Sequence, residues 1–356
     1  MSRALFRMMS LTIAMVWLCA SRAGFLAYAQ AGQAAPPQPA ASAEVIVYHA
    51  GSLNAMFDSM AETFGKATGI KVIHRGMGSV EAARRVTIGK EPCDIYASAD
   101  YRNIDAWLRP TYADFNVAFA QTAMVLTYLT SSPHAESIAD PAGPAFAPPA
   151  TVPNAAADWY SHLTQRGVRI GGSDPSADPG GYRGLMVMQL AQSFYRIPTL
   201  YEDLHRNYAV MAQTDRLGAN VDYQFSYEHS AKASAARDPS FRYVRLPREI
   251  DLSSPAQETR YSQTVVSIAG LAPTDPQFSM RGTRALFGLT LLKNAPNREA
   301  AIRFLQFMLS TRPGEGIALQ TAFGPEPIAP NGPAVVTKDD FPKIPSALSP
   351  LVKIGL

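Results

Sequence analysis

Three points in the chain combine glycine with a residue that suits the start of a helix. They are Gly51-Ser52, Gly78-Ser79 and Asp178-Pro179-Gly180. Glycine allows close approach to the backbone, serine and aspartate suit the N-cap position, and proline suits the first helical turn. The first amides of a helix lack intrahelical acceptors and carry the positive end of the helix dipole. The pattern therefore predicts a cradle in which helix N-termini bind a small anion without a counter-cation.

Other chemistry is open to some of the same residues. The hydroxyls of Ser52 and Ser79 can simply cap their own helices, which is the simpler interpretation of either one taken alone. A secreted hydrolase could use either serine with His49 as its base, but no G-x-S-x-G elbow surrounds a serine in this chain. Tyr223 and Tyr227 are spaced like a tyrosine pair that binds ferric ions. The histidines never show HExxH spacing, so the sequence does not predict a zinc site.

The strands and helices must bring these three glycine-containing segments close together if they bind one ligand. From Glu44 onward, short apolar runs alternate with helical spacing, and Gly-Ser joins the two patterns twice. The first helical pattern closes on Gly65 and Gly69, and a later one is expected to be capped by Asn297. The expected strands cover residues 44–50, 94–100, 116–130, 241–247 and 285–292, and the clearest late helix covers 297–310.

This alternation predicts an α/β fold in which each sheet is mostly parallel and is flanked by helices. Two such blocks predict two lobes. Residues 45–128 and 248–356 form the first, discontinuous lobe, and residues 129–247 form a second lobe inserted into it. Sheets of this kind bind ligands at the carboxyl ends of their strands, so we expect the ligand in the cleft between the lobes.

The amino-acid composition excludes some classes of function. The chain has 356 residues, of which 47% are hydrophobic and 17% charged, so it folds and is long enough for two domains. Lys and Arg number 32 and Asp and Glu 29. Arg3, Arg7 and Arg22 lie in an N-terminal segment without acids, and without them the charges balance. A neutral chain lacks the cationic excess that binding to nucleic acid requires.

The N-terminus has the pattern of an export signal. Residues 1–29 combine arginines, an apolar run and a small-x-small site ending at Ala29, and residues 30–44 are an Ala/Pro-rich flexible linker. We therefore expect a periplasmic protein. Bulky residues precede Cys19, so we do not expect lipid anchoring there. Once Cys19 is removed, Cys93 is alone and forms no internal disulfide; we expect a buried, inert thiol.

Seven segments, in order along nearly the whole mature chain, resemble the molybdate/tungstate-binding proteins of ABC transporters, in particular the archaeal-type tungstate-binding branch. The segments are HAGSL (49–53), GSVEAARRV (78–86), CDIYASADY (93–101), GSDPSADPGGYRGLMVMQLA (172–191), VDYQFSY (221–227), YVRLPREIDLS (243–253) and LKNAPNREAAIRFLQFMLS (292–310). This resemblance implies a type II periplasmic-binding fold that closes on one oxyanion and hands it to a membrane permease.

The resemblance also implies which residues bind the ligand. The implied contacts are Gly51, Ser52, Ser79, Asp178, Pro179, Gly180 and Tyr227. Asp178 matches one of two carboxylates that coordinate the Mo or W atom directly in the archaeal-type branch. A carboxylate beside a dianion would otherwise be repelled.

The second family carboxylate has no counterpart in this chain. Its position falls on Gln213 or Ala209, depending on where the alignment gap is placed, and neither side chain is anionic. Glu228 and Asp215 are nearby acids that no motif supports. We therefore expect binding nearer to tetrahedral, chiefly by hydrogen-bond donors, with Asp178 either protonated or a lone fifth ligand.

Together these inferences predict a monomeric periplasmic receptor, not an enzyme, that captures molybdate or tungstate for an ABC permease in the inner membrane. No cofactor is expected, because the oxyanion is cargo. The alternatives left open are a receptor for another oxyanion such as sulfate, a ferric-ion receptor and a secreted serine hydrolase.

Overall fold

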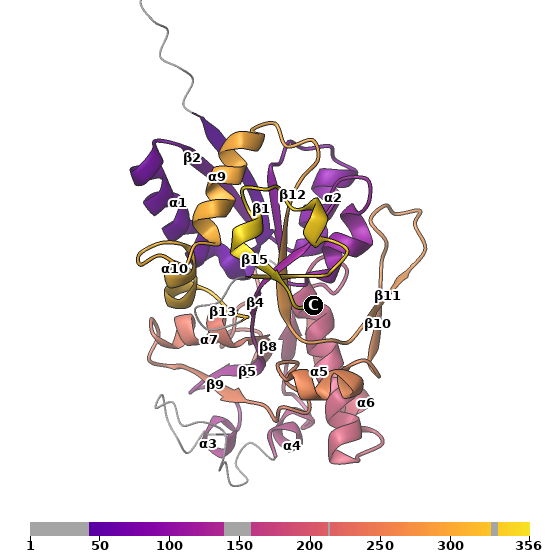
Figure 1. The fold of residues 1–356 in the computed structure, drawn as a ribbon. Helices are drawn as coiled ribbons and strands as arrows, with labels where there is room; N and C mark the ends of the chain where they lie inside the picture. Colours follow the sequence, from indigo (N-terminus) through magenta and orange to yellow (C-terminus); the bar gives the residue numbers. More distant parts are fainter. Residues whose placement is uncertain (1–42, 139–157, 213, 329–333) are drawn as a thin grey trace, which may run out of the picture. The chain divides into compact units, whose positions relative to one another are not determined.

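Two β-sheets with helices packed against them, and a separate two-stranded hairpin, make up the described fold (Figure 1). The computed structural model describes residues 43–138, 158–212, 214–328 and 334–356. The expected export signal with Cys19, most of the expected linker, and Gln213 lie outside the described residues.

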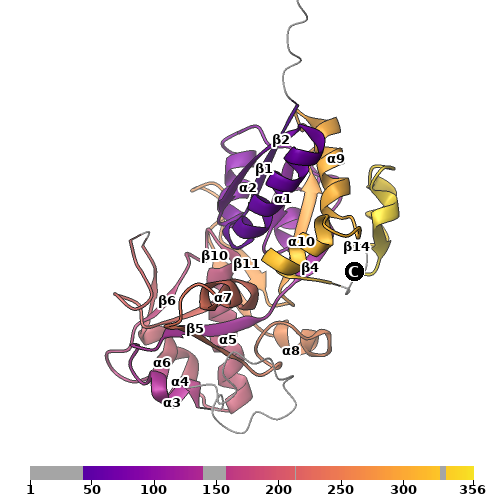
Figure 2. The ribbon, with the colours of Figure 1, turned by 90° about the vertical axis from the view of Figure 1, so that its left-hand side faces the viewer.

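The larger sheet has eight strands in the order β15-β14-β4-β12-β3-β1-β2, with β13 also paired to β4. Helices α1, α2 and α9 pack on its strands, and α10 packs on α1 (Figure 2). The strands are β1 (Glu44–Ala50), β2 (Lys71–Met77), β3 (Ile95–Ser98), β4 (Val117–Gln121), β12 (Leu286–Leu291), β13 (Glu326–Pro327), β14 (Ala334–Val336) and β15 (Val352–Ile354). The helices are α1 (Asn54–Thr68), α2 (Ser79–Thr87), α9 (Arg298–Met308) and α10 (Gly316–Phe323).

The smaller sheet has five strands in the order β7-β6-β8-β5-β9. Helix α5 packs on three of these strands, and α7 packs on β9 and β5. The strands are β5 (Met124–Leu129), β6 (Ile170–Gly172), β7 (Tyr208–Val210), β8 (Tyr223–Tyr227) and β9 (Phe241–Arg245). The helices of this part of the chain are α3 (Ala135–Ile138), α4 (Trp159–Leu163), α5 (Pro179–Tyr195), α6 (Leu200–Arg206), α7 (Glu228–Ala235) and α8 (Glu258–Tyr261).

The α/β fold with helix-flanked sheets is as predicted, but the prediction of mostly parallel sheets is wrong. Strand β1 runs parallel to β2 and β3, whereas β12 runs antiparallel to both β3 and β4. In the smaller sheet, β6 runs parallel to β7 and β8, whereas β5 runs antiparallel to β8 and β9. A strand–helix–strand alternation dictates a parallel pair only for the strands that it joins. Strands that follow a passage between the sheets, such as β5 and β12, are free to run the other way.

The strands of the smaller sheet all come from residues 124–245, and those of the larger sheet from residues 44–121 and 286–354. This distribution is what an inserted lobe would produce. The exact lobe boundaries stay a prediction. Strands β4 and β5 are separated only by Thr122 and Ala123, so the first passage between the sheets is short.

The predicted helix ends are found, with two differences. Helix α1 ends at Gly69, whose φ of +71° is the left-handed conformation that glycine adopts without strain, whereas Gly65 lies inside the helix. Asn297 occupies the N-cap position of α9 but makes no side-chain cap bond there. Its side-chain amide donates instead to Asp94 Oδ2, at 3.1 Å. Cys93 is buried, and burial raises the pKa of its thiol to about 12, as expected of an inert cysteine.

An antiparallel hairpin, β10 (Val265–Ile268) with β11 (Phe278–Arg281), was not predicted. Its strands are short, and the long intervening loop lacks the two-residue turn that marks a hairpin in sequence. Within the described ranges, no helix combines the length and apolar character needed to cross a bilayer.

Candidate ligand-binding site

The Ser52 hydroxyl lies at the turn between β1 and α1. Residues Gly51–Leu53 form a short 3-10 turn, and Ser52 Oγ is buried without a hydrogen-bond partner among the described residues. A buried hydroxyl in this state costs about 1–3 kcal/mol. A ligand oxygen that accepts its proton would remove this cost.

His229 connects Ser52 to Tyr227. The Ser52 carbonyl accepts a hydrogen bond from His229 Nε2 at 3.1 Å, and the rings of His229 and Tyr227 are stacked with centroids 5.8 Å apart. Burial lowers the pKa of His229 to about 4, although the bond to Ser52 opposes the shift, so the ring is neutral at physiological pH. His229 was not predicted as part of the site; its only signal in the sequence is its place two residues after Tyr227.

Ser79 is fully buried at the first residue of α2. Its Oγ accepts a hydrogen bond from the Ala99 amide at 3.0 Å. This bond uses a lone pair of the hydroxyl and not its proton, so the Ser79 hydroxyl keeps its capacity to donate.

The start of α2 contacts the loop before α5. The Ala177 carbonyl accepts hydrogen bonds from the amides of Val80 and Glu81, at 3.0 and 3.2 Å. A Cβ placed on Gly78 would lie 2.3 Å from the same carbonyl oxygen. Two first-turn amides of α2 therefore already have an acceptor within the chain. The expectation that the first amides of this helix are free is therefore wrong for Val80 and Glu81, because Ala177 reaches them from a distant segment.

Asp178 acts as the N-cap of α5, which begins with Pro179. Its Oδ1 accepts a hydrogen bond from the Gly180 amide at 2.6 Å, so this amide is also occupied. Burial raises the pKa of Asp178, while the Gly180 amide and Arg183 oppose the shift. A Cβ on Gly180 would lie 3.9 Å from Tyr227 Cε2, which places the start of α5 beside Tyr227.

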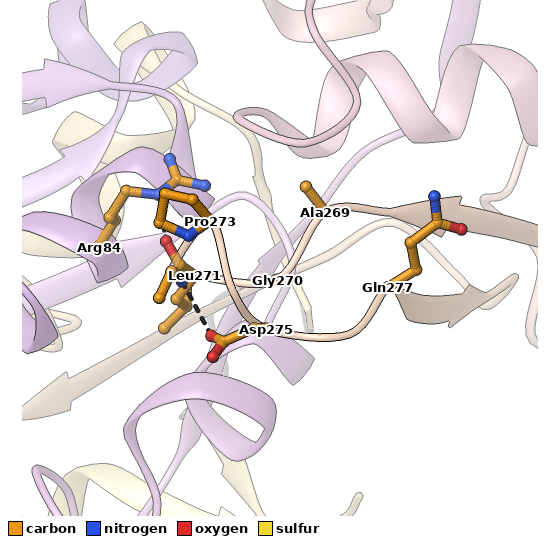
Figure 3. Close-up of a pocket in the computed structure, with 8 residues that line it drawn as sticks. Arg84, Ala269, Gly270, Leu271, Pro273, Asp275 and Gln277 are labelled. Atoms are coloured by element: carbon orange, nitrogen blue, oxygen red, sulfur yellow. Dashed lines mark hydrogen bonds between the residues drawn. The ribbon is translucent and has the colours of Figure 1, made fainter.

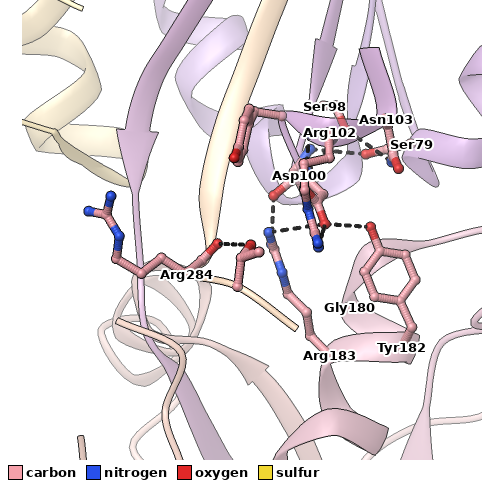
Figure 4. Close-up of polar contacts among 12 residues, drawn as sticks. Ser79, Ser98, Asp100, Arg102, Asn103, Gly180, Tyr182, Arg183 and Arg284 are labelled. Atoms are coloured by element: carbon pink, nitrogen blue, oxygen red, sulfur yellow. Dashed lines mark hydrogen bonds and ion pairs between the residues drawn. The ribbon is translucent and has the colours of Figure 1, made fainter. Parts of the chain in front are cut away.

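Arg183 lies one turn further along α5 and was not predicted. Its side chain is only 1% exposed, and Nη1 donates to the Ala99 carbonyl at 2.6 Å and to the Tyr227 hydroxyl at 3.1 Å. Figure 4 shows Arg183 and Tyr182 extending from α5 toward Asp100. A buried cation therefore lies beside Tyr227, one of the predicted contacts, whereas the sequence pattern predicts a cradle without a counter-cation. The missed signal is an arginine directly before the apolar run GLMVMQLA (184–191).

The predicted contacts thus form a connected set. Gly78 and Ser79 adjoin the loop that ends at Asp178, Gly180 adjoins Tyr227, and His229 joins Tyr227 to Ser52. What the set offers chemically is three hydroxyl groups, one carboxyl group and one neighbouring guanidinium.

The structure does not support His49 as a base for Ser52. His49 Nδ1 contacts the Ala50 carbonyl at 2.9 Å, and its Nε2 contacts His74 Nδ1 at 3.0 Å. Burial lowers the pKa of His49 to about 4. The Tyr223 hydroxyl donates to the Pro133 carbonyl, so this tyrosine is not aimed at a shared ligand with Tyr227.

The nearby acids give no second carboxylate. Arg245 and Lys232 pair with Glu228, at 2.5 and 3.3 Å. Asp215 Oδ2 accepts a hydrogen bond from the Ala212 amide at 2.7 Å, within its own loop. Ala209 is exposed on β7. In the part of the chain that the structure describes, no group of three or more His, Cys, Asp or Glu side chains could hold a metal ion.

A pocket of about 430 Å³ lies elsewhere, against the loop between β10 and β11 (Figure 3). Arg84 forms one wall, and its Nε donates to the Leu271 carbonyl at 2.8 Å. The pocket contains none of the predicted contacts. We therefore take the connected set around Tyr227, and not this pocket, as the candidate site.

The packing of Gly78 against Ala177 leads to a prediction. We expect Gly78→Ala to lower the free energy of unfolding by about 1–3 kcal/mol, because the added methyl group forces α2 and the loop apart. The backbone itself tolerates alanine, since φ of Gly78 is −59°. Urea unfolding measures the effect. Gly65→Ala is the control: its Cβ would meet only an ordinary contact of 3.5 Å, and alanine favours a helix interior. Equal stability of the two variants would show that this contact is absent in solution.

The family described as bacterial extracellular solute-binding protein matches residues 45–317. A molybdate/tungstate-binding protein of Pyrococcus abyssi is 32% identical over 305 residues, which cover 76% of this chain and 81% of that protein. A protein of the same description from Thermococcus kodakarensis is 32% identical over 299 residues, covering 74% and 77%.

One solved structure is similar in fold. The periplasmic molybdate-binding protein of Azotobacter vinelandii aligns with a TM-score of 0.51 at 15% identity, covering 80% of this chain and 99% of that one. At this identity the likeness concerns the fold alone.

Proposed function

The chain belongs to the family of bacterial extracellular solute-binding proteins, and we propose that it is a periplasmic receptor that captures molybdate or tungstate and delivers it to an ABC permease. Its likeness to a solved periplasmic molybdate-binding protein agrees with the type II periplasmic-binding fold expected from the sequence. In this proposal the protein is not an enzyme, acts as a monomer and needs no cofactor.

The observation that carries the proposal is a set of three hydroxyl protons for which no acceptor is found among the residues that the structure describes. Ser52 Oγ has no partner among the described residues, and the hydroxyls of Ser79 and Tyr227 each accept a hydrogen bond from a neighbour without donating in that bond. An oxyanion offers only acceptors, so these three donors suit it. A Cβ on Gly51 would meet no atom closer than the Met77 carbonyl oxygen at 3.9 Å, so the backbone there leaves room for a ligand.

Asp178 has two roles in this proposal. One oxygen caps α5, and the other oxygen is available as a ligand of the hard Mo(VI) or W(VI) atom. Glu228 is held by two cations and cannot replace the missing second carboxylate. We therefore propose coordination close to tetrahedral, with Asp178 at most a fifth ligand.

Delivery would require the two sheets to move relative to each other. The contacts of Ala177 with α2 and of Arg183 with the Ala99 carbonyl join elements of one sheet to elements of the other. They are the kind of contact that forms when lobes close on a ligand, and the permease would then recognise the closed form.

Selectivity would follow from ligand size. Molybdate and tungstate have longer metal–oxygen bonds than sulfate, so fixed donors can fit the larger ions and leave the smaller one with lost hydrogen bonds. Each buried donor left unpaired costs about 1–3 kcal/mol. Molybdate and tungstate are nearly equal in size, so this argument does not separate them.

Thermal unfolding with molybdate, tungstate, sulfate or phosphate tests the proposal. We expect molybdate and tungstate to raise Tm, because a ligand at 100 times its Kd adds about 2.7 kcal/mol to the stability of the native state. Stabilisation by sulfate alone would instead assign the protein to another oxyanion. Ester hydrolysis that Ser52→Ala abolishes would overturn the receptor proposal.

A further inference from the structure

Arg183 is a buried cation with donors to spare. Of its two terminal nitrogens, Nη1 makes both hydrogen bonds, to the Ala99 carbonyl and the Tyr227 hydroxyl. Nη2 is buried and has no hydrogen-bond partner among the described residues; its nearest acid is Asp100 Oδ2, at 3.6 Å. A buried guanidinium left partly unsatisfied is costly, so the arrangement calls for a further partner.

Asp100 alone does not neutralise the charge of Arg183. Arg102 Nη2 lies 2.8 Å from Asp100 Oδ2, and its Nε lies 3.2 Å from Asp100 Oδ1, so Arg102 is the closer ion-pair partner. The Tyr182 hydroxyl donates to the same carboxylate at 2.9 Å. Two arginines therefore face one fully buried aspartate (Figure 4), so Asp100 alone does not balance both charges. Asp178 is another buried carboxyl group that Arg183 affects, since the guanidinium opposes the rise of its pKa.

The side chain of Tyr227 lies against the Arg183 guanidinium. Arg183 Nη1 donates to the phenolic oxygen at 3.1 Å, which leaves the phenolic proton for another acceptor. The guanidinium carbon also lies 5.7 Å from the centre of the Tyr227 ring. A hydroxyl that accepts from a cation is polarised and becomes a stronger donor, as in other chains of hydrogen bonds at low dielectric.

We propose that Arg183 is a positioning residue of the oxyanion site, which fixes and polarises the Tyr227 hydroxyl as a donor and supplies buried positive charge against the dianion. This inference rests on the proposed function. Because Arg183 also holds the Ala99 carbonyl, after β3 of the larger sheet, and Tyr227, at the end of β8 of the smaller one, it links anion binding to the contact between the two sheets.

A double-mutant cycle on the full mature chain tests the inference, with molybdate binding measured by calorimetry. We expect Arg183→Met to weaken binding about 30-fold and Tyr227→Phe about 10-fold, within the range for losing a hydrogen bond that involves a charged group. If Arg183 acts through Tyr227, the double variant binds about as weakly as Arg183→Met alone. Losses that multiply to about 300-fold would overturn the link to Tyr227.

Arg102→Met is the matched control. It also removes a cation from Asp100, but its guanidinium bonds Asp100 and the Arg281 carbonyl and not Tyr227. We expect less than a threefold change in molybdate affinity. An equal loss in the Arg102 and Arg183 variants would reduce Arg183 to a structural role and overturn the inference.

Two further measurements keep the inference open to refutation if Arg183→Met does not fold. Arg183→Lys keeps the positive charge but loses the planar guanidinium group. The double-mutant cycle can be repeated with this variant. An unchanged molybdate affinity would overturn the role of the guanidinium geometry. Near-ultraviolet difference absorbance on adding molybdate reports the new hydrogen bond of a tyrosine. We expect a signal that Tyr227→Phe removes and Arg183→Lys weakens; a full signal in Arg183→Lys would also count against the inference.

Molybdate binding by the wild type and by Arg183→Met separates a failure of the Arg183 role from a failure of the proposed function. A wild-type protein that binds neither molybdate nor tungstate overturns both. A wild-type protein that binds them, with an Arg183→Met variant that binds equally well, overturns the role of Arg183 alone.

Discussion

Asp178→Asn is expected to lower molybdate affinity about 100-fold, the effect of losing a contact with a charged ligand group. Asparagine is as good an N-cap as aspartate, so its oxygen can still accept from the Gly180 amide and the start of α5 stays in place. What the substitution removes is the anionic oxygen available to the Mo or W atom. Calorimetric titration of the wild type and the variant measures the change.

The opposite result would identify a different role. If Asp178 only caps α5, removing its negative charge lessens the repulsion of a dianion, and Asp178→Asn binds more tightly. If the carboxyl group is protonated in the complex and acts as a donor, the asparagine amide replaces it and affinity is nearly unchanged. Burial raises the pKa of Asp178, and a raised pKa favours the protonated carboxyl group that this second result requires.

Asp178→Ala separates the cap from the ligand. It removes the acceptor of the Gly180 amide as well as the carboxylate, so it should cost about 1 kcal/mol of unfolding free energy that Asp178→Asn does not. X-ray absorption at the metal edge of the loaded wild type supplies an independent check. A six-coordinate spectrum would show a second protein ligand and overturn the near-tetrahedral proposal.

The local structure around the three glycine points could be predicted from sequence because its causes are local. The apolar run before Gly51, the helical spacing after it and the left-handed Gly69 depend on residues within one helix length. The same holds for Asp178 as the N-cap of α5, since a cap bonds an amide two residues away. These are the interactions that sequence patterns encode most directly.

The long-range partners of the site could not be predicted in the same way. Nothing near Ala177 in the sequence indicates that its carbonyl meets the amides of α2, almost a hundred residues earlier. The same applies to Arg183, whose partners Ala99, Asp100 and Tyr227 come from distant segments. A charged residue within an apolar helix indicates that a buried partner exists, but not which one. The antiparallel pairing of β12 with β3 and β4 likewise joins residues that are far apart in the sequence.

Asp100→Asn is expected to lower the free energy of unfolding by about 3–5 kcal/mol, because it leaves buried guanidinium charge without its counter-ion. Asp100 is fully buried after β3, beside Arg102 at 2.8 Å and Arg183 at 3.6 Å. Urea unfolding at neutral pH measures the loss. Asp203→Asn is the control, since the ion pair of Asp203 with Arg206 lies on the exposed surface of α6 and its loss should change stability little.

The pH dependence of the same measurement tests the cause. Burial opposes ionisation of Asp100, but Arg102 and Arg183 outweigh it and hold the pKa well below its usual range. A carboxyl group whose pKa is lower in the folded state stabilises the fold fully above its unfolded pKa of about 3.9. That contribution is lost as the pH falls from there toward the folded pKa. The gap between wild type and Asp100→Asn should therefore be constant from pH 6 to 8 and should narrow below about pH 4. A gap that stays constant at acidic pH would show that the aspartate acts by its shape and hydrogen bonds, and not by its charge.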